Sequence, residues 1–124
     1  MLPHPDLTKR VIGLAIEVHR NTGPGLLESV YVEFLALELI RANIAFQSQV
    51  AVPVTYKGTT VPMGFRADMI VENAIILEIK AVAALLPTHE AQILTYLRLS
   101  KIRVGLLINF HAIRLIDGLR RFIV

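Results

Sequence analysis

The sequence predicts an α/β domain with a mixed β-sheet, and three observations lead to this fold class. Residues 1–42 carry apolar side chains at helical spacing. Residues 46–80 are rich in β-branched residues and contain turn signals. One further helical segment follows, and after it come more apolar strands at 104–124. The chain has 124 residues, which is enough for a single domain, spanning 1–124, with a substantial core.

Two helices are expected at the N-terminus. Asp6 or Thr8 can cap the first, which runs to about Arg20. Its apolar face consists of Leu7, Val11, Leu14, Ala15 and Val18. Residues 21–25, with the sequence NTGPG, interrupt the helical pattern. A second helix then covers about 27–42.

Strands are expected in the middle of the chain. Residues 46–56 alternate well enough for a strand, and Pro53 places that strand at an edge or beside a bulge because proline donates no backbone hydrogen bond. Lys57-Gly58 predicts a turn, and a short segment at 61–63 follows it. Next comes a hairpin over 65–80, FRADMIVENAIILEIK.

The last third of the chain contains a helix and further strands. Pro87 opens the third helix, which continues to about Ser100, because a missing N–H is harmless in the first turn. Residues 104–110 predict a buried strand. Asp117-Gly118, between 113–116 and 119–124, predicts a two-residue hairpin turn.

The hairpin over 65–80 contains charges in an otherwise apolar setting. Asp68, Glu78 and Lys80 lie inside it, where a charged group is costly unless something compensates it. If the turn at Glu72-Asn73 pairs residue 70 with 76, Asp68 lies opposite Glu78 and Arg66 lies opposite Lys80. We favour this register because Ala67, Met69 and Val71 then share a wholly apolar face with Ile75, Leu77 and Ile79.

Two neighbouring carboxylates repel each other, and a divalent cation removes that penalty. Hard oxygen ligands suit Mg²⁺ or Mn²⁺, which also accept phosphate oxygens. Lys80 follows Glu78 on the same face and can orient or deprotonate an attacking water. The pattern therefore suggests metal-assisted phosphodiester hydrolysis. The alternative is an ordinary ion pair between Glu78 and Lys80, with Asp68 a polar residue near an edge.

Two more groups of polar residues are candidates. Helical spacing aligns Glu28 with the apolar face of Tyr31, Val32, Leu35 and Leu39, so it is either a further metal ligand or an acid that favours the helix N-terminus. His89, Gln92 and Tyr96 form a polar stripe on the third helix. This stripe is either a solvent-facing surface or a set of side chains near the phosphate to be cleaved.

Composition limits the other possibilities. The absence of cysteine excludes disulfides, thiolate zinc sites and a cysteine nucleophile. The N-terminus has no signal-peptide core and no apolar run is long enough for a membrane span, so a soluble cytoplasmic protein is expected. The formal charge of +3 permits nucleic-acid binding, although scattered basic residues usually form an ordinary surface. The 54% hydrophobic content predicts a homo-oligomer, such as a dimer, that covers apolar surface.

Taken together, these motifs resemble the PD-(D/E)xK nuclease superfamily, and in particular a small stand-alone group named for a GxxExxY motif. Gly25, Glu28 and Tyr31 match that motif. The similarity extends over AIEVHRNTGPGLLESVY, FRADMIV, ILEIKAV, HEAQILTYL and GLLINF. One position departs from the pattern, since Ala67 replaces the proline that names the superfamily motif.

The resemblance implies a restriction-endonuclease-like core, a mixed central sheet flanked by helices. It also implies that Asp68, Glu78 and Glu28 serve the metal, that Lys80 serves the hydrolytic water, and that Gln92 and Tyr96 form a Q-x-x-x-Y element. Arg66, His89 and Tyr96 are weaker candidates for substrate binding. The expected function is a Mg²⁺- or Mn²⁺-dependent nuclease acting on DNA or, less favoured, RNA. The alternative is a non-catalytic module that binds nucleic acid or protein on the same scaffold.

Overall fold

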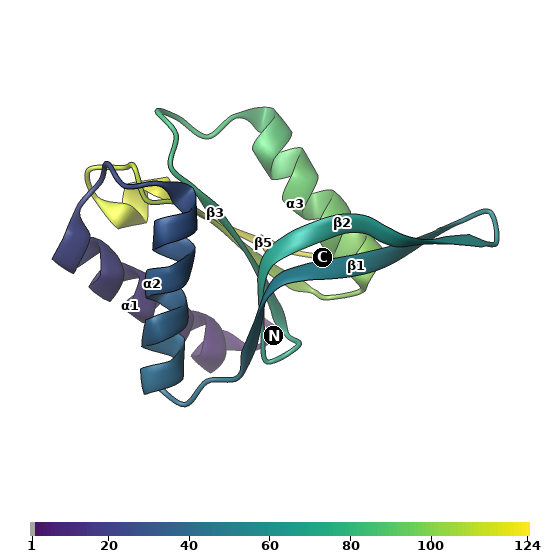
Figure 1. The fold of residues 1–124 in the computed structure, drawn as a ribbon, viewed down its shortest axis with the longest axis horizontal. Coiled ribbons are helices and arrows are strands. Elements are labelled where there is room, and N and C mark those ends of the chain that lie inside the picture. Colours follow the sequence, from purple (N-terminus) through teal and green to yellow (C-terminus); the bar gives the residue numbers. More distant parts are fainter. Residues whose placement is uncertain (1) are drawn as a thin grey trace.

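A computed structural model describes residues 2–124 and contains one mixed five-stranded sheet flanked by helices (Figure 1). The elements are α1 (Pro5–Thr22), α2 (Glu28–Arg41), β1 (Phe46–Tyr56), β2 (Thr59–Val71), β3 (Ile75–Lys80), α3 (Pro87–Ser100), β4 (Val104–Asn109), the 3₁₀ turn η1 (Leu115–Gly118) and β5 (Leu119–Ile123). The strand order is β1-β2-β3-β4-β5. Only β3 and β4 are parallel, and α3 makes the crossover between them. The predicted fold class is confirmed.

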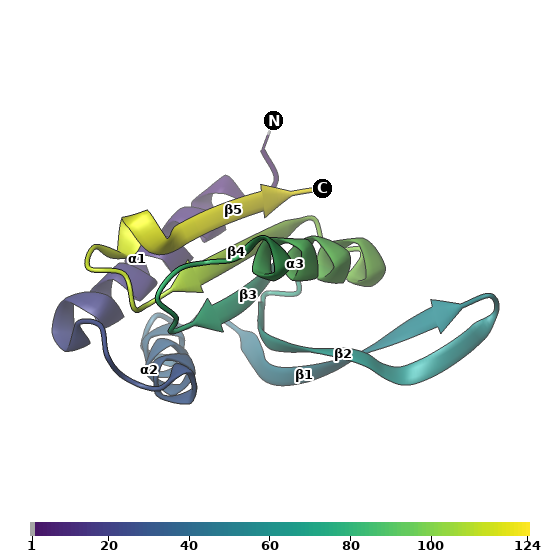
Figure 2. The same ribbon diagram turned by 90° about the horizontal axis from the view of Figure 1, so that it is seen from above.

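The helices cover the two faces of the sheet unequally, with α1 and α2 on one face and α3 on the other (Figures 1 and 2). The larger core lies under α1 and α2, where Val11, Tyr31 and Leu35 pack with Leu77 and Leu106. The smaller core lies under α3. There Leu97 packs with Phe65, Ala67, Ile70 and Ile76. Within residues 2–124 no helix is both long and apolar enough to span a membrane.

The strands β3 and β4 lie at the centre of the sheet. Every residue of β4 is buried, and so is every residue of β3 except Lys80, which is half-buried. Gly105 on β4 permits the close approach of α3, because a Cβ there would lie 2.9 Å from Ile93 and 3.0 Å from Leu97. A charged side chain on β3 is therefore surrounded by packed protein.

The β2–β3 hairpin has the predicted register. Ile70 pairs with Ile76 and Met69 with Leu77. The ladder ends there, so neither of the two predicted pairs beyond it, Asp68 with Glu78 and Arg66 with Lys80, is formed. Arg66 instead pairs with Ala51 on β1.

A break in the β1–β2 ladder explains why β2 leaves β3 at this point. Gln49 adopts a φ of 53°, and no pair joins it to Asp68, although Ser48 pairs with Met69 and Val50 with Ala67. The prediction that Ala67 shares a face with Met69 is therefore wrong. Ala67 packs under α3, whereas Met69 packs under α1 and α2.

Two further expectations need correction, and one is confirmed. Neither Asp6 nor Thr8 caps α1, which begins at Pro5 after His4, and the Thr8 hydroxyl donates to the His4 carbonyl within the first turn. The separate segment predicted at 61–63 belongs to one continuous strand, β2. The bulge predicted at Pro53 is present in the edge strand β1.

Asp117-Gly118 does not form the predicted two-residue hairpin. Residues 115–118 form η1, and Leu115 is buried in the core. Gly118 lies so close to β4 that a Cβ would be 2.5 Å from the Asn109 carbonyl oxygen. Burial of Leu115 and this close backbone approach prevail over the local turn preference.

Candidate active site

Asp68 and Glu78 lie together where β2 leaves β3. Met69 and Leu77 form the last pair of the hairpin ladder. Asp68 directly precedes Met69 in β2, and Glu78 directly follows Leu77 in β3. Its Oδ2 accepts a 2.8 Å hydrogen bond from the backbone N–H of Ile79, next to Glu78 in β3. This bond fixes the Asp68 carboxylate beside Glu78, so the two predicted acids converge.

Glu78 is the most unusual group in the hairpin. Only 4% of the residue is exposed, and its Oε1 has no hydrogen-bond partner within residues 2–124. Burial, followed by the negative charge of Asp68, raises the pKa of Glu78 from 4.5 to about 9, while Lys80 opposes the rise. A buried acceptor without a partner is costly, so this oxygen is suited to a ligand.

Lys80 lies two residues beyond Glu78 on the same face of β3 and is half-buried. Its backbone carbonyl accepts a 2.8 Å hydrogen bond from Phe110, which holds the end of β3 against β4. The ion pairs recorded for residues 2–124 do not include Lys80 or Glu78. The alternative of an ordinary Glu78–Lys80 ion pair is therefore not observed.

Glu28 approaches the same end of β3 from α2. Its Oε2 accepts a 3.3 Å hydrogen bond from the N–H of Ala81, the residue after Lys80. Glu28 is exposed, so the prediction that it points to the packed side together with Tyr31 is wrong. As the first residue of α2 it lies at the margin of the core. No group of three acids or histidines close enough to hold one ion occurs among residues 2–124.

The loop before α2 is held by Tyr31. The buried tyrosine hydroxyl donates to the Gly23 carbonyl at 2.6 Å and accepts from the Leu26 N–H at 3.2 Å. Its ring stacks on Phe110 with centroids 4.6 Å apart. Gly25, within the loop, has a φ of 112°, which favours glycine. Tyr31 and Gly25 therefore position the start of α2, where Glu28 lies.

Replacement of Tyr31 by phenylalanine should destabilise the protein by about 1–3 kcal/mol, because two hydrogen bonds of the 23–26 loop lose their partner. Urea unfolding measures the change. Tyr56→Phe is the matched control, since Tyr56 is 68% exposed, and it should change stability by less than about 0.5 kcal/mol. Equal effects of the two substitutions would contradict this role of Tyr31.

Asn109 is a polar residue of the site that the sequence analysis missed. It is 4% exposed and pairs with Lys80 in the parallel ladder. Its Oδ1 accepts from the N–H groups of Val82 and His111, and its Nδ2 donates to the Val82 carbonyl. Asn109 therefore holds the segment that follows Lys80. The feature of the sequence that could have revealed Asn109 is its position as the one polar residue at the end of the apolar run VGLLIN.

The three residues of the predicted polar stripe on α3, His89, Gln92 and Tyr96, lie in different environments. Tyr96 is half-buried and stacks on Phe65 at 3.9 Å between centroids. Burial raises the pKa of Tyr96, the charges of Glu78 and Asp68 raise it further, and Gln92 opposes them. Tyr96 is therefore near the two acids, and the exposed Gln92 lies beside Tyr96.

The weaker candidates lie further out. His89 is half-buried in the first turn of α3, and its Nδ1 accepts the N–H of Leu86 at 3.0 Å, so one ring nitrogen already has a structural partner. Arg66 is exposed on β2, two residues before Asp68. Within residues 2–124 neither side chain forms an ion pair with Glu78, and neither donates a hydrogen bond to it.

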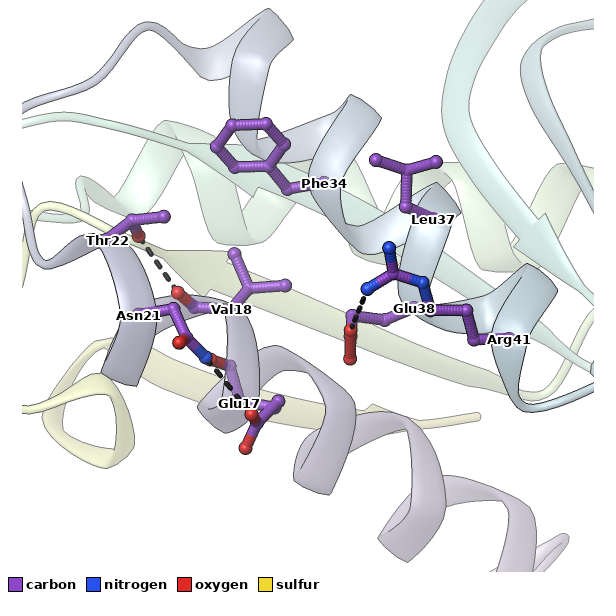
Figure 3. A pocket seen from close by; sticks show the side chains of 8 residues that line it. All are labelled: Glu17, Val18, Asn21, Thr22, Phe34, Leu37, Glu38 and Arg41. Carbon is purple, nitrogen blue, oxygen red and sulfur yellow. Dashed lines mark hydrogen bonds and ion pairs between the residues drawn. The ribbon is translucent and has the colours of Figure 1, made fainter.

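A groove of about 330 Å³ lies elsewhere, between α1 and α2 (Figure 3). Its polar groups interact with one another, since Asn21 donates to Glu17 and Arg41 pairs with Glu38 at 3.7 Å. The acids of the hairpin do not line it. The candidate active site is therefore the junction of β2, β3 and α3.

The fold agrees with the comparison to protein families. The chain belongs to the PD-(D/E)XK nuclease superfamily, whose family model matches residues 5–122. Comparison with curated proteins and with solved structures gave no match.

Proposed function

We propose that the protein is a divalent-metal-dependent nuclease that hydrolyses phosphodiester bonds of nucleic acid, with DNA preferred to RNA. The observation that carries the proposal is the buried Glu78 carboxyl, whose Oε1 has no hydrogen-bond partner within residues 2–124, beside Asp68. Such a pair is unfavourable in a protein interior unless a proton or a cation neutralises it. Membership of a nuclease superfamily supports the same function.

Asp68 and Glu78 would hold the metal ion, and their carboxylate oxygens fit Mg²⁺ or Mn²⁺. Glu28, hydrogen-bonded one residue beyond Lys80, would act through water rather than as a direct ligand. When bound, the ion lowers the pKa of a coordinated water and neutralises charge on the phosphate.

The other groups would act on the water and the substrate. The Lys80 ammonium group lies on the Glu78 face, where it can orient the attacking water and offset negative charge on the phosphate. The Tyr96 hydroxyl, near the two acids, can donate a hydrogen bond to a phosphate oxygen. Gln92 can hold the same oxygen or the Tyr96 hydroxyl. Arg66 and His89 are candidates for contacts with more distant phosphates.

A non-catalytic binding module on the same scaffold is the alternative. Such a module would gain nothing from a buried carboxylate without a partner, and removal of that group would stabilise it. The geometry therefore favours catalysis.

We also propose that the protein forms a homo-oligomer. The exposed apolar side chains on and before α2, Leu27 at 71% and Ile40 at 59%, support an interface there. Light scattering of the purified protein measures the oligomeric state, and a monomer at all concentrations would contradict the proposal.

Removal of the metal tests the proposed activity. Purified protein incubated with labelled DNA and RNA should cleave nucleic acid in Mg²⁺ or Mn²⁺ and not in EDTA, because the ion would activate the attacking water and offset charge on the phosphate. Restoring Mg²⁺ should restore cleavage. Folded protein that leaves both DNA and RNA intact in either metal, across linear, nicked and branched substrates, would overturn the proposal.

A further inference from the structure

The charges of the molecule are distributed unevenly. Between Glu38 and Asp68 the sequence contains no acid. The ion pairs recorded within residues 2–124 all involve α1, α2 or the η1 region: Arg20 with Glu17, Arg41 with Glu38, and Arg114 with Asp117. The cations of the β1–β2 hairpin and of the C-terminal end of α3 are in none of them. These cations are Lys57, Arg66, Arg98 and Lys101.

The outer part of the β1–β2 hairpin is exposed along its whole length. Every residue from Thr55 to Gly64 is exposed, and we call this segment the arm. It projects well beyond the body of the domain in both views (Figures 1 and 2). Tyr56 is 68% and Met63 58% exposed. Because an isolated two-stranded ribbon is marginally stable in water, these side chains indicate a surface that a partner covers.

The arm nevertheless has a defined shape. The Lys57 ammonium lies 5.3 Å from the centroid of the Tyr56 ring, and the hydroxyls of Thr55 and Thr60 are 2.9 Å apart. At its base, Gly64 leaves room for the Val54 side chain, which a Cβ would overlap. The bulge between Val52 and Val54 bends the ribbon at the same place.

The arm is continuous with the candidate active site. Its last residue, Gly64, is four residues before Asp68 on the same strand. The C-terminal end of α3 lies at its base, since Leu97 and Ile102 belong to the same apolar cluster as Val52 and Val54. Arg98 directly follows Leu97 in the sequence, and Lys101 directly precedes Ile102. The arm and the adjoining end of α3 therefore carry cations and no acid, next to the strand that carries Asp68.

We propose that the arm, with Lys57, Arg66, Arg98 and Lys101, binds a DNA duplex and holds the phosphate to be cleaved at Asp68 and Glu78. The inference rests on the proposed nuclease function and adds the surface and the form of the substrate. The major groove of B-DNA admits a two-stranded ribbon, whereas that of A-form RNA is too deep and narrow. Exposed Tyr56, Val61 and Met63 can contact thymine methyl groups or unstacked bases. The absence of acids favours DNA over a second copy of this chain as the occupant.

The test is DNA binding in EDTA, where binding is measured without cleavage. Fluorescence anisotropy of a labelled duplex should show about tenfold weaker binding for Lys57→Glu than for the wild type at low salt. Lys57→Ala should reduce the slope of log K against log salt by about 1. Lys9→Glu is the matched control, because Lys9 is exposed on α1 and undergoes the same change of charge. It should bind like the wild type.

The other outcomes are distinct. Equal binding by Lys57→Glu and the wild type would overturn the role of the arm, even where the wild type cleaves DNA in Mg²⁺. If Lys57→Glu weakened binding of single-stranded DNA or duplex RNA as much as it weakens binding of duplex DNA, the assignment of duplex DNA to the arm would be wrong. A Tyr56→Ala variant that binds DNA normally but changes from dimer to monomer in light scattering would make the arm an interface between copies. Weaker binding by Lys57→Glu with no cleavage by the wild type would support the arm and count against the nuclease.

Discussion

Replacement of Lys80 by methionine is expected to lower the rate of nucleic-acid cleavage by about 10²–10⁴-fold, the range for loss of a positioned catalytic group. Methionine is similar in length and keeps the apolar contacts of the half-buried stem. It removes the ammonium group from the face that carries Glu78. The loss should appear in kcat rather than in KM, because this group acts on the water and on charge that develops during the reaction.

Two measurements separate this result from simple unfolding. Thermal unfolding should show that Lys80→Met remains folded, and Mg²⁺ should still stabilise it, because the two acids are unchanged. Lys9→Met, on the exposed surface of α1, is the matched control and should cleave at the wild-type rate. A Lys80→Met variant that is as active as the wild type would remove Lys80 from the mechanism.

The central hairpin was predictable because its information is local. Side chains alternate with a period of two, and only one register leaves an unbroken apolar face, so pairing of residue 70 with 76 followed from the sequence. The convergence of Asp68 with Glu78 depends on that register. The Lys80–Arg66 pairing failed because Gln49 interrupts the neighbouring ladder with a positive φ, which no pattern in β2 reveals.

The position of Glu28 and the role of Asn109 depend on contacts that are distant in sequence. Glu28 reaches Ala81 across 53 positions, and Asn109 reaches Val82 across 27. Helical periodicity places Glu28 on a face but does not show that the core ends before it. The arm was missed for a related reason, since alternation in 46–71 predicts strands without showing which residues lack a covering layer.

The pKa of Glu78 predicts a dependence of stability on pH. In the unfolded chain this carboxyl titrates near its ordinary value of 4.5, whereas in the folded protein its pKa is about 9. Between these values the unfolded chain has lost the proton and the folded protein retains it. Stability measured in EDTA should therefore fall as the pH rises from about 5 to about 9, by up to about 1.4 kcal/mol per pH unit. Of the charged groups that face Glu78, Asp68 raises this pKa and Lys80 lowers it.

Glu78→Gln should remove most of this slope, because the amide is similar in shape and does not titrate. A bound cation replaces the proton, so stabilisation of the wild type by Mg²⁺ should grow as the pH rises, and Glu78→Gln should lose it. Thermal unfolding with Mg²⁺ and with EDTA across this pH range measures both effects, and Glu33→Gln, at an exposed position of α2, is the control. A slope that persists in Glu78→Gln would assign the titration to another group. Mg²⁺ stabilisation that also persists would place the ion away from Glu78, and the buried carboxyl would then have no ligand to account for it.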